Sequence, residues 1–190
     1  NVSYENDIEI KDKISAEINL LEECEKEILR LIFNYGEKLL TFESYQEKVS
    51  LYIMEELISD NITFSNSLYK KILEEYSSLS SHNKVNIKYF LNHQEVEIQQ
   101  LAINLISKRH EISKKWEDLH HIFIEDETKN LEKTIEKSIL CLKQAYIKAE
   151  IYKINLQLNE NIDSIKIIES LNKHNKALVA INKLLGRNFN

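Results

Sequence analysis

The absence of proline most constrains what this chain can fold into. Its 190 residues include no Pro and only two Gly. Proline removes a helical hydrogen bond and glycine costs backbone entropy, so a chain nearly free of both can sustain long helices. A collagen-like or Pro/Gly-rich disordered chain is excluded. Ile and Leu are abundant throughout, which is enough apolar material for one sizeable core. We predict an all-α protein.

The first predicted helix begins near Glu22 and ends at Gly36, where glycine can adopt a positive φ. Its apolar residues recur at spacings of three and four, which places them on one stripe. They are Cys24, Ile28, Leu31, Ile32 and Tyr35. The acidic cluster Glu22–Glu27 would then lie at the helix start, where the helix dipole favours negative charge. It needs no catalytic explanation.

A second helix is predicted to begin at Ser44–Glu47, because this sequence matches a capping box. The buried stripe would be Val49, Ile53 and Leu57, with Asn61 as the stop. Shorter segments follow up to residue 124. They are a helix from near Ser65 to Tyr76, a serine-rich loop over 77–83, a helix over 85–91, a capped start at 92–95, a helix capped by Ser113 that carries Trp116, and either an extended link or a buried helix end at 122–124.

Nothing interrupts the helical pattern from about Asp126 to Asn159, a length of roughly 50 Å at about 1.5 Å per residue. A polar turn over 159–161 leads into a last helix that ends at Gly186. Two helices joined by a short turn lie antiparallel, so we expect a long helical hairpin. The inward positions of the last helix are Ile168, Leu171, Leu178, Ile181 and Leu185.

The predicted organisation is a helical bundle followed by a long antiparallel helical hairpin. Residues 1–20 are a linker or an N-terminal helix, 21–124 form the bundle, and 125–190 form the hairpin. A two-helix hairpin cannot bury both faces, so its tip would leave apolar surface for another protein. The alternative, in which the hairpin folds back fully onto residues 20–124, stays open. Because the chain begins at Asn1, we expect it to be a fragment of a longer protein.

Charge and cysteine content limit the partners and the compartment. The net charge is −6, divided as −9 over residues 1–80 and +3 over residues 81–190. A strongly basic nucleic-acid-binding domain is therefore not expected. Cys24 and Cys141 lie far apart and are predicted to be buried, reduced thiols of a cytoplasmic protein. No run approaches the roughly 18 apolar residues of a membrane span.

No convincing active site is visible. Phosphate-binding glycine loops and CxxC metal patterns are missing, so we expect no catalytic residue, no metal and no cofactor. Glu117 and His120 form one Glu-x-x-His step, whereas a carboxylate-bridged di-iron bundle needs two with further glutamates. His93 and Glu97 are interpreted as a surface pair or a helix cap. A ferritin-like di-metal helical bundle and a self-associating coiled-coil protein remain the alternative functions.

Several stretches resemble the C-terminal helicase-binding domain of DnaG-type bacterial DNA primases, in the form found in the Bacteroidetes. The likeness extends over roughly residues 20–190. It rests on the runs Glu25–Gly36, Val49–Ile62 with its Glu-Glu-Leu-Ile-Ser-Asp centre, Thr63–Tyr69, Ser113–Trp116 and Asn182–Arg187.

This resemblance implies a helical bundle with a protruding hairpin that binds the N-terminal domain of the replicative DnaB-type helicase during DNA replication. The parent chain would be a DNA primase, and this part would not be an enzyme. No catalytic or metal residue of the family falls in the matching region. The predicted partner-binding residues are Leu178, Ile181, Leu184 and Leu185, with Lys183 and Arg187 at the rim. For the four apolar residues, packing within the hairpin remains an equal alternative.

Overall fold

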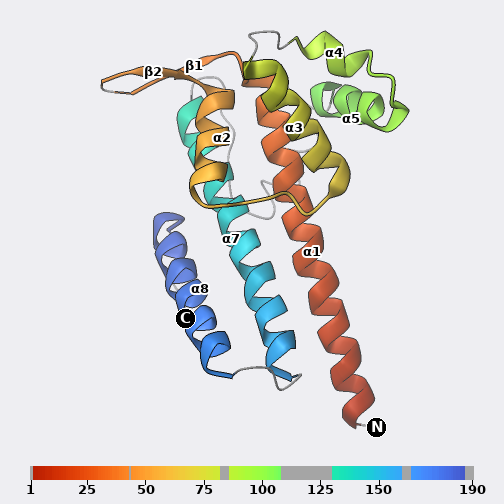
Figure 1. Ribbon diagram of the computed structural model, residues 1–190, viewed down its shortest axis with the longest axis vertical. Helices are drawn as coiled ribbons and strands as arrows, with labels where there is room; N and C mark the ends of the chain where they lie inside the picture. The colour runs from red at the N-terminus through yellow and green to blue at the C-terminus, as the bar shows by residue number, and fades with distance from the viewer. Residues whose placement is uncertain (1, 43, 82–85, 108–129, 160–163, 187–190) are drawn as a thin grey trace. The chain divides into compact units, whose positions relative to one another are not determined.

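The computed structural model describes residues 2–42, 44–81, 86–107, 130–159 and 164–186. Within them the protein is mainly all-α, as predicted (Figure 1). The described elements are α1 (Val2–Tyr35), β1 (Leu39–Thr41), β2 (Gln46–Lys48), α2 (Val49–Ser59), α3 (Ser67–Ser81), α4 (Ile87–Leu91), α5 (Val96–Ser107), α7 (Leu131–Asn159) and α8 (Ser164–Leu184).

The chain divides into two compact units. One comprises Asn1–Cys24 with Lys137–Asn190, and the other comprises Glu25–Glu136. These units do not coincide with the boundaries expected at residues 20 and 124, because α1 and α7 each contribute to both units. Of the two alternatives for residues 1–20, the structure has a helix over residues 2–20.

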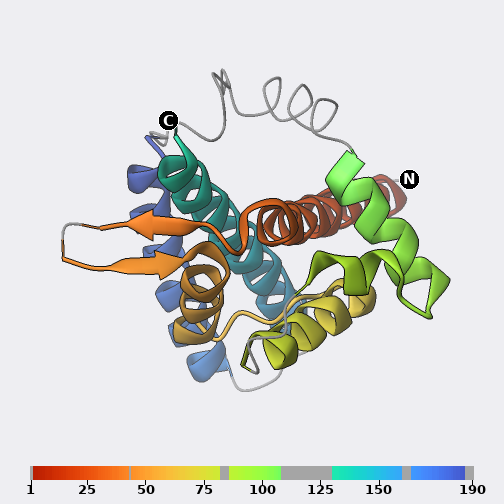
Figure 2. The ribbon, with the colours of Figure 1, turned by 90° about the horizontal axis from the view of Figure 1, so that it is seen from above.

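The last third of α1, from Glu25 to Tyr35, forms the centre of the Glu25–Glu136 unit. Seen from above, the β-hairpin, α2, α3, α4 and α5 surround its C-terminal end (Figure 2). Ile28, Leu29 and Leu31 are all fully buried, so this part of α1 is covered on every side rather than along one stripe. The rings of Phe33, Tyr76 and Phe90 pack together with centroids 5.0–6.4 Å apart. They join α1 to α3 and α4.

The acidic cluster Glu22–Glu27 lies inside α1 and not at a helix start, so that prediction was wrong. Glu25 is fully buried, and its carboxylate accepts hydrogen bonds from the backbone N–H groups of Ser65 (2.5 Å) and Asn66 (3.1 Å). These two amides precede α3 and have no partner within that helix. Glu25 therefore fixes the connection between α2 and α3.

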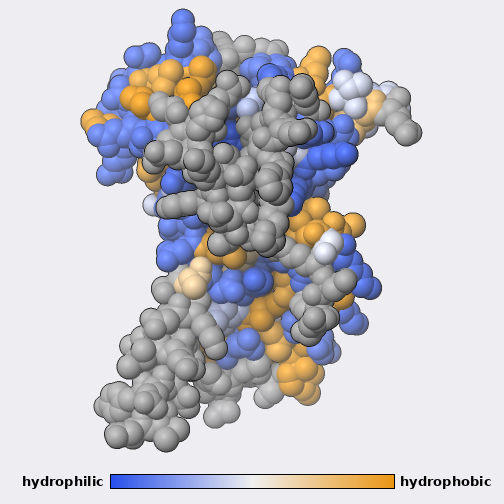
Figure 3. Space-filling model, turned by 180° about the vertical axis from the view of Figure 1, so that it is seen from behind, coloured by the Kyte–Doolittle hydropathy of each residue, from blue (hydrophilic) through white to orange (hydrophobic). Residues whose placement is uncertain are grey.

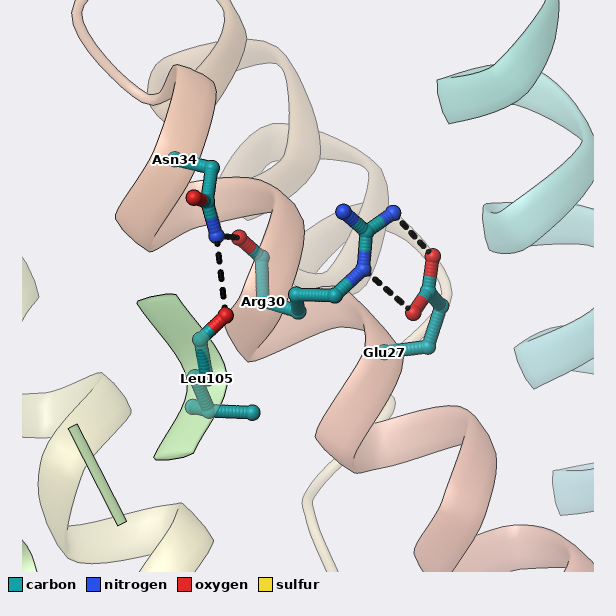
Figure 4. A network of polar contacts seen from close by, with 4 residues as sticks. All are labelled: Glu27, Arg30, Asn34 and Leu105. Carbon is teal, nitrogen blue, oxygen red and sulfur yellow. Dashed lines mark hydrogen bonds and ion pairs between the residues drawn. The ribbon is translucent and has the colours of Figure 1, made fainter. Parts of the chain in front are cut away.

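A second buried polar group on α1 is an ion pair between Glu27 and Arg30 (Figure 4). Arg30 donates from Nε and Nη2 to the two carboxylate oxygens of Glu27, each at 2.7 Å. One turn further, Asn34 donates to the backbone carbonyls of Arg30 (2.8 Å) and Leu105 (3.2 Å). Asn34 thereby ties the end of α5 to α1.

Gly36 ends α1, but not through a positive φ as predicted, since among the described glycines only Gly186 has one. A Cβ at Gly36 would collide with the backbone oxygen of Ile32 and the hydroxyl of Tyr76. Both the N–H and the hydroxyl of Ser50 donate to the Gly36 carbonyl, at 3.1 and 2.9 Å. Glycine is required here because three elements approach one another closely.

The β1–β2 hairpin replaces the helix start predicted at Ser44–Glu47. The strands are antiparallel with Leu40 opposite Glu47, and α2 begins only at Val49 with no side-chain cap. Leu40 is buried and Phe42 stacks on Tyr45, so cross-strand packing prevails over the local capping box. The predicted stop is confirmed, since α2 ends at Ser59 and Asn61 follows with a φ of 53°.

The remaining predicted boundaries up to residue 124 either can be compared with the structure or lie outside the described residues. Residues 77–81 of the predicted serine-rich loop belong to α3. The α5 helix begins at Val96, just after the predicted capped start, and His93 Nδ1 accepts a hydrogen bond from the Glu95 N–H at 3.1 Å. The predictions for Ser113, Trp116 and 122–124 lie outside the described residues.

The other unit contains the first part of α1, most of α7 and all of α8. The α7 and α8 helices run antiparallel, as the predicted hairpin requires, and α1 lies along α7 (Figure 1). Lys148 of α7 pairs with Glu17 of α1 at 3.6 Å. The expected two-helix hairpin is thus a three-helix arrangement, in which α1 covers part of the surface that a bare hairpin would leave open.

Candidate partner-binding face of helix α8

The contact between α8 and α7 is organised around two buried amides. Asn182 and Gln144 are both buried, and Gln144 Nε2 donates a hydrogen bond to Asn182 Oδ1. On α8 the same side carries half-buried residues at helical spacing. These are Ile167, Leu171, His174, Leu178, Ile181 and Leu185. Because it shares the side of the helix that carries Asn182, this stripe lies on the side of α8 that faces α7.

The rest of α8 leaves large apolar side chains exposed. The exposed fractions are 75% for Ile165, 49% for Ile168, 41% for Val179 and 72% for Leu184. At about 100° per residue, Ile168 and Val179 lie on one side of the helix, about three turns apart. Leu184 lies about 140° further round, on the opposite flank of the stripe that faces α7. Hydrophobic residues reach the surface around α7 and α8 among hydrophilic ones (Figure 3).

The six predicted partner-binding residues occupy three kinds of position. Lys183 and Leu184 are exposed, whereas Leu178, Ile181 and Leu185 are half-buried on the stripe toward α7. Arg187 lies outside the described residues. The structure therefore brings the three half-buried residues together and places Leu184 apart from them.

Sequence reasoning singled out Leu184 but missed the other three exposed apolar residues of α8. Ile168 was predicted to face inward and is instead half exposed, and Ile165 and Val179 were not singled out. The signal was present in the run Ile165–Ile168, which carries more isoleucines than one buried stripe can use.

Positive charge borders this face. Lys173, Lys176 and Lys183 are exposed on α8, and only Glu169 offsets them within the helix's described side chains. Lys176 and Lys183 lie on the same side of the helix as Ile165 and Val179. We define the outer face of α8 as Ile165, Ile168, Val179 and Leu184 with Lys176 and Lys183.

The residues considered for metal binding or catalysis do not belong to α8. In the described part of the chain, no group of three or more His, Cys, Asp and Glu residues could hold a metal ion. His93 lies 3.2 Å from the Glu75 carboxylate on α3, rather than pairing with Glu97. Cys24 and Cys141 are buried and not joined in a disulfide. Glu117 and His120 lie outside the described residues.

Fold and site together define an all-α protein whose last helix presents apolar and basic side chains to solvent. The sequence matches, over residues 11–188, the family model described as "Domain of unknown function (DUF8430)", and the chain belongs to that family. No significant match is found among curated proteins or among solved structures. Among the described residues, no helix combines the length and the apolar character needed to cross a membrane.

Proposed function

We propose that this chain is a non-catalytic protein-interaction module that docks a DNA primase onto the replicative DnaB-type helicase. The observation that carries the proposal is the exposed outer face of α8. Ile165 and Leu184 are each about three-quarters exposed. Burying one such side chain against a partner contributes roughly 1.5–3 kcal/mol.

The chemistry of the outer face favours a helical protein partner. Apolar side chains at helical spacing dock into a groove between helices of another protein. Lys176 and Lys183 at the border would pair with acidic residues around that groove and set the register. The resemblance to primase C-terminal domains supports the N-terminal domain of the helicase as the partner.

The module would act by raising an effective concentration. Bound to the helicase, it holds the primer-synthesising domain of its parent chain close to single-stranded template, so that a diffusive encounter becomes intramolecular. Catalysis would belong to that parent domain, and the module itself would need neither a cofactor nor direct contact with nucleic acid. The proposed setting is the bacterial cytoplasm, where the helicase works.

A second copy of the chain could also cover the outer face, which is the coiled-coil alternative. The two functions differ in what happens at rising concentration. A self-associating protein gains mass without any helicase, whereas a docking module stays monomeric until the helicase domain is added. Light scattering of the purified chain separates them, and a stable dimer held by α8 would contradict the docking proposal.

The test is calorimetric titration of the chain with the N-terminal domain of the DnaB-type helicase from the same organism. We expect saturable binding that Ile168→Asp and Val179→Asp each weaken at least tenfold, because each places a charge in an apolar contact. Val96→Asp is the matched control, since Val96 is an exposed apolar residue of α5. Absence of binding by the unaltered chain would contradict the proposed function.

A further inference from the structure

Three aromatic rings meet at the surface where the β-hairpin joins α2. Phe42 and Tyr45 stack with centroids 4.7 Å apart, and Phe42 lies 5.4 Å from Tyr52. The backbone holds them there, because Phe42 N–H donates to the Tyr45 carbonyl at 2.9 Å and Tyr52 belongs to the first turn of α2. Tyr45 remains 52% exposed.

Two carboxylates border these rings. Glu47 lies opposite Leu40, so the alternation of strand side chains places it on the same face as Phe42 and Tyr45. Glu55 follows Tyr52 by about one turn of α2. Partial burial and the negative charge of Glu55 both raise the pKa of Glu47. The two carboxylates are therefore close enough to repel each other.

The nearby lysines interact elsewhere. Lys48 Nζ lies 2.8 Å from the Glu37 carboxylate, and Lys38 Nζ lies 5.1 Å from the centre of the Tyr35 ring. In the part of the chain that the structure describes, no ion pair joins Glu47 or Glu55 to a basic side chain. Preformed aromatic faces and uncompensated negative charge are thus combined at one place.

We propose that Phe42, Tyr45, Glu47, Tyr52 and Glu55, named here the aromatic–acidic patch, bind an arginine-bearing segment of another protein. A guanidinium group stacks on aromatic rings and pairs with carboxylates in the same plane, which a lysine ammonium cannot do. Leu51 and Ile58 continue the surface along α2 on the same side as Glu55, and both are exposed. They would contact apolar residues of the segment.

Charge selects this partner over the other class that stacks on aromatic rings. Bases of single-stranded nucleic acid also stack on tyrosine, but their phosphates are repelled by Glu47 and Glu55. Binding of a single-stranded oligonucleotide at this surface would therefore contradict the proposal.

The test uses the full chain labelled with nitrogen-15 and a blocked pentapeptide, Leu-Gly-Arg-Gly-Leu, followed by nuclear magnetic resonance. The reference peptide carries citrulline, which is neutral and has the shape of arginine. We expect the arginine peptide to shift the amide signals of residues 42–55 and to bind about tenfold more tightly than the citrulline peptide. Equal binding of the two peptides, or no binding, would overturn the proposal.

Two variants tie the binding to the aromatic–acidic patch. Tyr45→Ala and Glu55→Gln are each expected to lower the affinity for the arginine peptide several-fold. The first removes an aromatic ring of the aromatic–acidic patch, and the second removes a negative charge. Glu97→Gln is the matched control, since Glu97 is an exposed carboxylate on α5. Unchanged affinity in both patch variants would refute the assignment. Ile168→Asp on α8 should bind the peptide normally, so failure of helicase docking and failure of this patch give different results.

Discussion

Gln144 and Asn182 join α7 to α8 through a hydrogen bond between two buried side-chain amides. Apolar packing between two helices tolerates a slip of one turn, since another apolar residue takes the vacated place. A buried amide does not tolerate it, because it would be left without its partner in an apolar contact. This pair therefore fixes the register that sets which residues of α8 face outward.

Removing one amide should destabilise the fold more than removing both. Gln144→Leu leaves the Asn182 amide buried without that partner, and we expect a loss of about 1–3 kcal/mol in the free energy of unfolding. The double variant Gln144→Leu/Asn182→Leu should recover part of this loss. Urea denaturation followed by circular dichroism measures both, and strictly additive losses would contradict a pairwise role.

The buried ion pair on α1 should matter far more than an exposed pair of the same geometry. Glu27 and Arg30 are three residues apart with a 2.7 Å contact, and so are the more exposed Glu150 and Lys153. Arg30→Met leaves a buried carboxylate, at an expected cost of about 3–5 kcal/mol. Lys153→Met should cost less than about 1 kcal/mol. Similar costs for the two variants, measured by urea denaturation, would show that burial is not the deciding factor.

Alanine at the two glycines should be costly for different reasons. Gly36→Ala introduces a Cβ that meets Ile32 and Tyr76, and we expect a loss of about 1–3 kcal/mol through overpacking. Adding Tyr76→Phe removes the hydroxyl and should reduce that loss. Gly186→Ala meets no atom within 4 Å, but Gly186 has a φ of +68°, so about 1–2 kcal/mol is lost to backbone strain. Thermal unfolding tests whether adding Tyr76→Phe raises the unfolding temperature of Gly36→Ala and leaves that of Gly186→Ala unchanged.

Alkaline pH should destabilise the protein partly through Tyr76. Burial raises the pKa of Tyr76, while its hydrogen bond with Ser50 opposes that shift. The unfolded chain then releases this proton at a lower pH than the folded chain, so stability is present below pH about 10 and is lost as pH rises through the folded pKa. Unfolding midpoints between pH 9 and 11 should fall more steeply for the unaltered chain than for Tyr76→Phe. Parallel curves would contradict a raised pKa.

Much of the fold could be predicted, because apolar residues that recur at helical spacing over long segments indicate helices directly. The helical character, the α7–α8 hairpin and the stops at Asn61 and Gly186 follow from spacing and from missing breakers. The β-hairpin was missed because Phe42–Tyr45 stacking is a contact across strands, which a local capping pattern at Ser44 conceals. The capping-box rule considers only residues that are neighbours in the sequence, so it takes no account of a contact across a hairpin.

The burial of polar residues and the exposure of the outer face of α8 could not be predicted, because both depend on which other elements pack against each helix. Glu25 looks like a solvated charge in the sequence, but it is buried because it caps the start of α3, forty residues further along the chain. Ile168 continues the helical spacing of Leu171 and Leu178, but it is exposed whereas they are half-buried. The burial of Glu25 and the exposure of Ile168 both depend on tertiary contacts, and the spacing of apolar residues in the sequence does not predict such contacts.

Thiol labelling at the outer face of α8 examines the docking proposal at a single position. Cys24 and Cys141 are buried, so Val179→Cys introduces an accessible thiol, and Val96→Cys provides the control on α5. With saturating helicase N-terminal domain, we predict that labelling of residue 179 by iodoacetamide slows at least tenfold while residue 96 reacts at its original rate. Unchanged labelling of residue 179 in the bound complex would contradict docking through α8.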